Sequence, residues 1–162
     1  MTTIKDLAAS GKISRINELE RERYLLFYTV SHNDNIKHSK FVIDTFPRWS
    51  IISGYYAMHD ATKLFIAKAY GYKIDEDVHS TTIRLLGEIL KDDDLVGLFE
   101  SGYGEYRKMA GELYGAREER RRAQYYTGTS FAADYFRKRA RKFHEEIVEP
   151  YLEKLSVLED AL

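Results

Sequence analysis

The chain has 162 residues, which suits one compact domain that hides roughly 70% of its unfolded surface without covalent cross-links. It contains no cysteine, so disulfide scaffolds, thiolate catalysis and cysteine-ligated metal sites are excluded. The 25 basic and 26 acidic side chains nearly cancel, which excludes a uniformly basic nucleic-acid-binding protein but not a local basic patch.

The first segment, residues 1–13, is polar and is expected to be flexible, ahead of a single domain over residues 14–162. It lacks the basic and apolar regions of a signal peptide. The longest apolar runs of the chain are far shorter than the roughly 20 residues that span a bilayer. Together with the missing cysteines, this favours a cytoplasmic protein without a membrane partner.

Helical periodicity dominates the domain. Apolar residues three or four apart predict one long helix or two shorter helices over residues 14–46, and only two prolines, Pro47 and Pro150, interrupt the rest. Residues 48–70 are apolar on almost every side, which predicts the central, most buried helix. Gly71 is its expected C-terminal cap.

The second half of the chain is also expected to be helical, over residues 79–90, 105–125 and about 130–158. Gly97 and Gly102 precede the second of these helices, and Pro150 is expected to kink the last. No alternating strand of useful length is present. The fold class is therefore all-α, an up-and-down helical bundle of about five helices.

Charge is distributed unevenly along the chain. Between Arg117 and Lys142 there are nine basic residues and three acidic ones, whereas residues 145–160 are acidic. Basic side chains beside tyrosines can bind phosphates and stack bases, and Arg117, Arg121 and Arg141 are the candidate ligand-binding residues. The alternative is a solvated face that pairs with acidic segments of the same chain or of a second copy.

His144 is the strongest single candidate for acid–base chemistry. It follows Arg137 and Arg141 at the spacing i, i+4, i+7, so one helix face presents two guanidinium groups and an imidazole. Positive neighbours favour a neutral imidazole, which can take a proton from a ribose hydroxyl while an arginine holds the phosphate. Arg139 lies about 140° away from His144 around a regular helix. The alternative is again a solvated basic face.

A polar stripe on the central helix contains Tyr56, His59, Asp60 and Lys63. These residues could hold a ligand phosphate or sugar, or form a buried polar network that fixes the register of the helix. His79 follows three acidic residues, but no second histidine is suitably spaced, so we expect a helix cap there and no metal site. Glycine-rich phosphate loops, dinucleotide fingerprints and nucleophile elbows are absent, and no cofactor is expected.

The stretch Ser53–Leu64 reads SGYYAMHDATKL and resembles the second long helix of HEPN domains. That helix typically reads Ser-Tyr-Tyr-Ala-Met-Phe-His-Ala-Ala-Arg/Lys-Ala-Leu. The helix start His79–Thr81 is similar to the family's His-Ser/Thr motif, and Leu113–Arg117 with Ala123–Tyr125 resembles its Arg…Ala-Asp-Tyr segment. In this order the resemblance covers about residues 15–158.

The resemblance implies a HEPN-like bundle that forms a homodimer and, in many prokaryotic members, pairs with a minimal nucleotidyltransferase. Many members act as toxins or defence components. A large subset are metal-independent ribonucleases in which four to six residues separate an Arg from a His, and Arg139 and Arg137 match that loose spacing before His144. Glu146 stands where those members commonly carry Tyr.

Two functions are therefore expected. The first, which rests on the polar stripe of the central helix and on the basic segment 117–142, is a HEPN-like module that binds a nucleotide or RNA or docks a nucleotidyltransferase, as part of a toxin–antitoxin or defence system. The second is a metal-independent endoribonuclease in which His144 is the acid or base and Arg137 or Arg139 binds the scissile phosphate. A third possibility is a structural dimer without a ligand.

Overall fold

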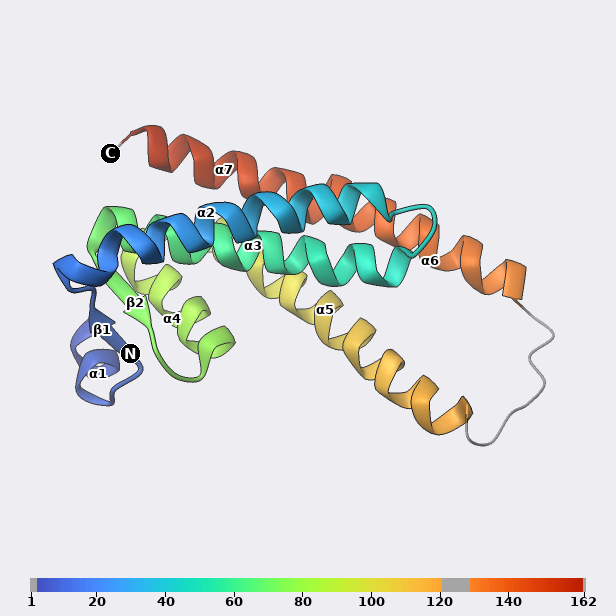
Figure 1. Ribbon diagram of the computed structural model, residues 1–162, viewed down its shortest axis with the longest axis horizontal. Coiled ribbons are helices and arrows are strands. Elements are labelled where there is room, and N and C mark those ends of the chain that lie inside the picture. The colour runs from blue at the N-terminus through green and yellow to red at the C-terminus, as the bar shows by residue number, and fades with distance from the viewer. Residues whose placement is uncertain (1–2, 121–128, 162) are drawn as a thin grey trace.

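The structure is a computed structural model that describes residues 3–120 and 129–161, with side chains for 3–111 and 134–161. It confirms the all-α class: long helices pack side by side in a bundle (Figure 1). The elements in chain order are α1 Ile4–Ala9, β1 Ile13–Arg15, α2 Glu18–Phe41, α3 Pro47–Tyr70, β2 Tyr72–Ile74, α4 Val78–Leu90, α5 Asp93–Arg120, α6 Thr129–Phe143, a π-helical turn His144–Val148 and α7 Glu149–Asp160.

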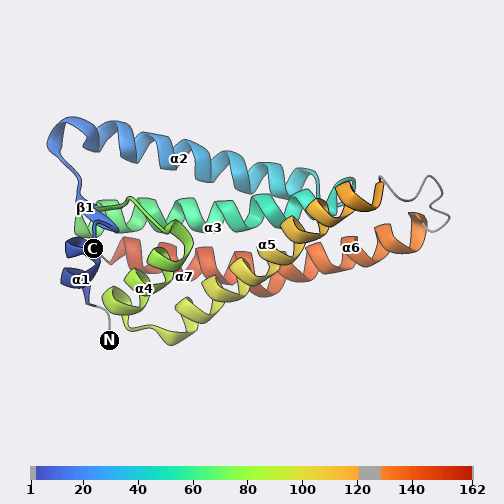
Figure 2. The ribbon, with the colours of Figure 1, turned by 90° about the horizontal axis from the view of Figure 1, so that it is seen from below.

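Helix α3 is the centre of the bundle, as its apolar composition predicts. It lies between α2 on one side and the helices of the second half of the chain on the other (Figure 2). Its core residues include Tyr55, Met58 and Phe65, each with at most 1% of its surface exposed. Gly71 ends the helix in the left-handed conformation with φ of 68°, and its N–H donates to the carbonyl of Ala67, which confirms the expected cap.

The start of the chain differs from the flexible segment that its polarity predicts. Thr3 and Asp6 form a capping box at the start of α1, and Leu7 of this helix is buried in the core. Strand β1 then pairs antiparallel with β2, with Ile13 opposite Ile74 and both buried. Burial of Leu7 and Ile13 therefore holds this short segment against the bundle, although most of its residues are polar.

The question of one helix or two before Pro47 is settled, because α2 is continuous from a capping box at Asn17 and Glu20. Helix α5 begins at Asp93, earlier than expected, and carries Gly102 inside it. A Cβ at Gly102 would lie 3.0 Å from Met58 Cε, so this glycine permits close packing of α5 on α3 and does not end a helix.

The last helix changes geometry just before Pro150. Residues His144–Val148 form a π-helical turn in which the Glu149 N–H donates to the carbonyl of His144. Helix α7 then starts with Pro150 in its first turn, where a missing N–H costs little. In the part of the chain that the structure describes, no helix has the length and apolarity to span a membrane.

Candidate phosphate-binding site

Two members of the polar stripe of α3, Asp60 and Lys63, contact α2. Ser31 Oγ and Asn35 Nδ2, both from α2, donate to the Asp60 carboxylate at 2.6 and 3.0 Å. Further along the same two helices, His38 Nδ1 of α2 lies 2.7 Å from Ser53 Oγ of α3. Asp60 is therefore part of a polar network that joins α2 to α3, as the second interpretation of the stripe expects for this residue.

Lys63 and Tyr56 of the stripe have protein partners as well. Lys63 Nζ donates to Tyr28 Oη at 3.1 Å and lies 5.1 Å from the centre of that ring. The hydroxyl of Tyr56 lies 3.2 Å from that of Tyr106 on α5. Lys63 is 8% exposed, so a ligand could reach its ammonium group only after side chains move.

Replacing Lys63 with methionine is expected to change the free energy of unfolding by less than about 1 kcal/mol, because the stem still packs and the charge no longer needs burial. Urea titration of the wild type and the variant would measure the difference. A loss above about 3 kcal/mol would show instead that the fold needs the Lys63 charge.

His59 lies inside an aromatic cluster that the sequence did not reveal. Its side chain is 4% exposed, and neither ring nitrogen has a hydrogen-bond partner among the described residues. Burial lowers the pKa of His59, and the nearest carboxylate oxygen, Asp60 Oδ1, is 3.6 Å from its Nδ1. The rings within contact of one another in this cluster are those of Tyr55, Tyr56, His59, His79, Phe99, Tyr103 and Tyr106.

His79 joins this cluster, two residues after the N-cap position of α4 at Asp77. Its Nδ1 lies 2.5 Å from Tyr55 Oη, its ring stacks on Tyr103 at 4.7 Å, and burial lowers its pKa to about 4. Asp77 precedes α4 without a side-chain cap and pairs with Lys12 at 3.0 Å. Among residues 3–111 and 134–161, no group of histidines and carboxylates is arranged to hold a metal ion.

His144, the candidate acid or base, is inserted between α2 and α3. Ser39 Oγ donates its only proton to the carbonyl of Ser50, so His144 Nε2 carries the proton and donates to Ser39 Oγ at 2.5 Å. Nδ1 is then the unprotonated nitrogen, and it is buried without a hydrogen-bond partner among the described residues. Burial lowers the pKa of this histidine, which is 5% exposed. This imidazole is neutral and positioned to hold helices together.

Arg137 and Arg141 lie on the same side of α6 as His144 but bind a different group. Arg137 Nε donates to the carbonyl of Asp44, and Arg141 Nη2 donates to the Asp44 carboxylate at 2.6 Å. Asp44 lies in the connection between α2 and α3, so the two arginines clamp this turn onto α6. Arg137, Arg141 and His144 therefore share one side of the helix, as their spacing predicts. Asp44 partly neutralises the charge of the two arginines, and the imidazole of His144 is buried.

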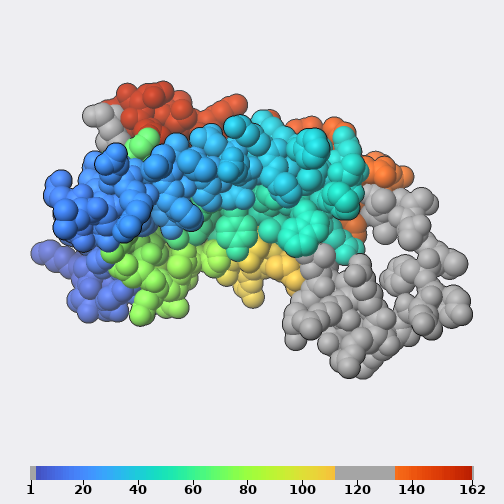
Figure 3. All heavy atoms as spheres, viewed as in Figure 1, coloured from blue at the N-terminus to red at the C-terminus, as the bar shows by residue number. Residues whose placement is uncertain are grey.

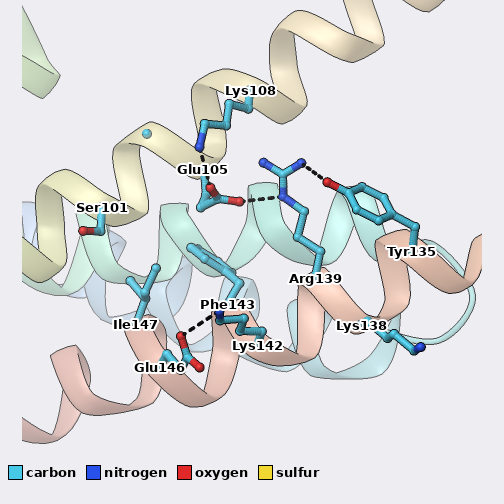
Figure 4. Close-up of a pocket in the computed structure, with 11 residues that line it drawn as sticks. Ser101, Glu105, Lys108, Tyr135, Lys138, Arg139, Lys142, Phe143, Glu146 and Ile147 are labelled. Carbon is cyan, nitrogen blue, oxygen red and sulfur yellow. Dashed lines mark hydrogen bonds and ion pairs between the residues drawn. The ribbon is translucent and has the colours of Figure 1, made fainter. Parts of the chain in front are cut away.

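Arg139 points the other way, into a pocket between α5 and α6 (Figure 4). Its Nε donates to Glu105 Oε2 at 2.8 Å, and Lys108 Nζ donates to the other oxygen of Glu105 at 3.0 Å. Burial tends to raise the pKa of Glu105, but these two hydrogen bonds outweigh it and the pKa is lowered. Glu105 of α5 therefore binds Lys108 of its own helix and Arg139 of α6.

The lining of this pocket carries positive charge and an aromatic ring. The pocket has a volume of about 860 Å³. The ring of Tyr135 in its lining is half exposed, and the Tyr135 hydroxyl lies 3.4 Å from Arg139 Nη1. Lys142 pairs loosely with Glu146 at 3.6 Å, and Lys138 forms no ion pair within the described side chains. Four cations and two carboxylates line the pocket: Lys108, Lys138, Arg139, Lys142, Glu105 and Glu146.

Two candidate residues cannot be placed. Arg121 lies outside the described residues, and Arg117 belongs to α5 with a side chain that also lies outside them. Sequence reasoning missed Glu105, Lys108 and Tyr135 as members of one site. In the sequence, Glu105 and Lys108 lie one helical turn apart, and Tyr135 lies one turn before Lys138 and Arg139. This spacing indicates that each group shares a helix face, but it does not reveal that α5 and α6 bring the two groups together.

Comparisons with protein-family models, curated proteins and solved structures found no match to the chain.

Proposed function

We propose that the protein is a HEPN-like, non-catalytic module that binds phosphate groups of single-stranded RNA in the pocket between α5 and α6. The observation that carries this proposal is the lining of the pocket, with four cations, two carboxylates and an exposed tyrosine ring in about 860 Å³. Phosphate contacts from Lys and Arg supply most of the affinity for RNA that is not read by sequence.

The arrangement of the lining suits a flexible strand. Lys138 and Lys142 lie four residues apart on α6, and both line the pocket. Tyr135 lies one turn before Lys138 on that helix, and its half-exposed ring provides a stacking surface for a base. The ion pair of Glu105 with Arg139 joins α5 to α6 within the same pocket.

The surroundings of His144 favour binding over cleavage. A ribonuclease needs an acid or base within reach of the ribose hydroxyl, and this imidazole is buried against Ser39 and Ser50. The two arginines on its side of α6 are held by Asp44. The resemblance to HEPN domains adds a nucleotidyltransferase partner and a toxin–antitoxin or defence setting to the proposal.

Reversing two charges in the lining of the pocket, Lys138→Glu with Lys142→Glu, is expected to weaken RNA binding at least tenfold at low salt, since each lost phosphate contact also reduces counterion release. Fluorescence anisotropy with a labelled single-stranded oligonucleotide would measure the affinity. The same titration at several salt concentrations should show a shallower salt dependence for the variant.

The matched control places the same two charge changes far from the pocket, Lys5→Glu on α1 with Lys91→Glu after α4, and should leave affinity within about twofold at one salt concentration. Equal weakening by both pairs would show a general charge effect and contradict the proposed site. RNA cleavage in EDTA by the wild type but not by His144→Ala would overturn the non-catalytic assignment.

A further inference from the structure

The Glu105–Arg139 pair is less exposed than the lysines that line the pocket between α5 and α6. The side chains of Glu105 and Arg139 are 19% and 18% exposed. Those of Lys108 and Lys142 are 63% and 69% exposed. Figure 3 shows that α2 and the first part of α3 cover much of one face of the molecule, and neither helix contributes a described residue to the pocket. A ligand therefore approaches from the side of α5 and α6 and meets the lysines before it meets the pair.

Glu105 makes the contacts that a phosphate group makes in an anion-binding site. Its two carboxylate oxygens accept hydrogen bonds from two different cations, Arg139 Nε at 2.8 Å and Lys108 Nζ at 3.0 Å (Figure 4). A guanidinium and an ammonium group are also the usual partners of a phosphate. The Tyr135 hydroxyl lies 3.4 Å from Arg139 Nη1 and borders the same place. The pocket therefore contains an anion-binding subsite that the protein's own carboxylate occupies.

We infer that the terminal phosphate of an RNA strand displaces Glu105 from Arg139 and Lys108, an inference that rests on the proposed function of the pocket. A phosphomonoester carries a charge of about −1.5 to −2 at pH 7, whereas a phosphodiester carries one negative charge, as a carboxylate does. The terminal group therefore competes with Glu105 for the two cations. An internal phosphate has no such advantage and leaves Glu105 in place.

The low exposure of the pair also favours the end of a strand. An internal phosphate is joined to a sugar on both sides, so two nucleosides must enter a recess with it. A terminal phosphate has a single covalent attachment and enters ahead of its strand. The rest of the strand then lies over the exposed Lys138 and Lys142, with a base on Tyr135. Glu105 thus acts as a selectivity element that admits the more highly charged group.

Strands that differ only in their ends test this inference. Three single strands of about ten nucleotides, labelled at an internal base, carry a 5′-phosphate, a 3′-phosphate or hydroxyls at both ends. Fluorescence anisotropy should show about fivefold tighter binding of at least one phosphorylated strand than of the hydroxyl-ended strand, and the two phosphorylated strands distinguish the two ends. Arg139→Gln and Lys108→Gln should each reduce this preference below about twofold, because each removes one of the two cations.

Glu105→Gln keeps the size of the side chain and removes the competing charge. It should tighten binding of the preferred phosphorylated strand about threefold more than binding of the hydroxyl-ended strand. Glu146→Gln is the matched control, because Glu146 also lines the pocket but is 62% exposed and pairs loosely with Lys142. This control should change the affinity for all strands by the same factor. Circular dichroism should show equal helicity in all variants.

Equal affinity of the wild type for all three strands, with binding still weakened by Lys138→Glu and Lys142→Glu, would overturn this inference and leave the proposed function standing. A preference for a phosphorylated strand that Arg139→Gln leaves intact would also overturn it, since the terminal phosphate would then bind elsewhere. Absence of binding to all three strands at low salt would contradict the proposed function itself.

Discussion

Acidification from about pH 7 to about pH 4.5 is expected to lower the free energy of unfolding by roughly 1–2 kcal/mol through His79 alone, because one pKa unit corresponds to about 1.4 kcal/mol. The buried His59 and His144 add to the loss in the same direction. Burial lowers the pKa of His59 and His144, and it lowers that of His79 to about 4. The range allows for solvent screening at His79, which is only partly buried.

The direction of the effect follows from proton binding. In the unfolded chain a histidine takes up a proton near pH 6.5, whereas in the fold these three stay neutral to lower pH. The stabilisation is complete above about pH 6.5 and is lost as the pH falls. Urea titrations at a series of pH values would measure it.

His59→Phe provides the internal control for this titration. Neither ring nitrogen of His59 has a hydrogen-bond partner among the described residues, and aromatic rings surround it, so phenylalanine should fit with a change within about 1 kcal/mol at neutral pH. The slope of the free energy of unfolding against pH measures how many more protons the unfolded state binds than the folded state. This number should be smaller by about one in the variant. A slope as steep as that of the wild type would show that His59 does not contribute.

Gly54→Ala is expected to destabilise the protein by about 1–3 kcal/mol, although alanine has the higher helix propensity. A Cβ at this position would lie 3.0 Å from Phe143 Cε1, 3.1 Å from Ser39 Oγ and 3.3 Å from Val148 Cγ2. These atoms belong to α6, α2 and the π-helical turn, so the methyl group would separate all three from α3. It would also disturb the Ser39 contact that holds His144.

Gly97→Ala is the matched control, because Gly97 is also inside a helix but has nothing within 4 Å of the added Cβ. Propensity alone should then stabilise the protein by about 0.5–1 kcal/mol. Thermal and urea unfolding of both variants would measure the opposite signs. Stabilisation by Gly54→Ala would show that α3 does not approach its neighbours this closely.

The sequence predicts the elements of this fold well where local signals agree. Pro47 at a helix start, an apolar run and Gly71 at the end correctly bound α3, and the periodicity of α4 correctly places its end at Leu90. Glycine misled the prediction in α5, where Gly97 and Gly102 lie inside the helix. A glycine that permits close packing and one that ends a helix look alike in one sequence.

The candidate site is harder to predict, because it depends on which helices meet. The i, i+4, i+7 spacing correctly places Arg137, Arg141 and His144 on one side of α6. Spacing does not reveal that Ser39 and Ser50 bury this imidazole, or that Arg139 meets Glu105 from another helix. The burial of a side chain and the residues that it contacts depend on how the helices pack. Periodicity in the sequence indicates only the direction in which a residue points around its own helix.

The π-helical turn at His144–Val148 has a consequence for the length of the chain. A π turn has hydrogen bonds one residue longer than those of an α-helix, so it behaves as a single-residue insertion that the fold has absorbed. It shifts the rotational phase of α7 relative to α6 without breaking the helix. The apolar face of α6 and that of α7 can therefore each be directed at the core. Inserting or deleting one residue here would change the rotation of α7 relative to α6 while the bundle is kept.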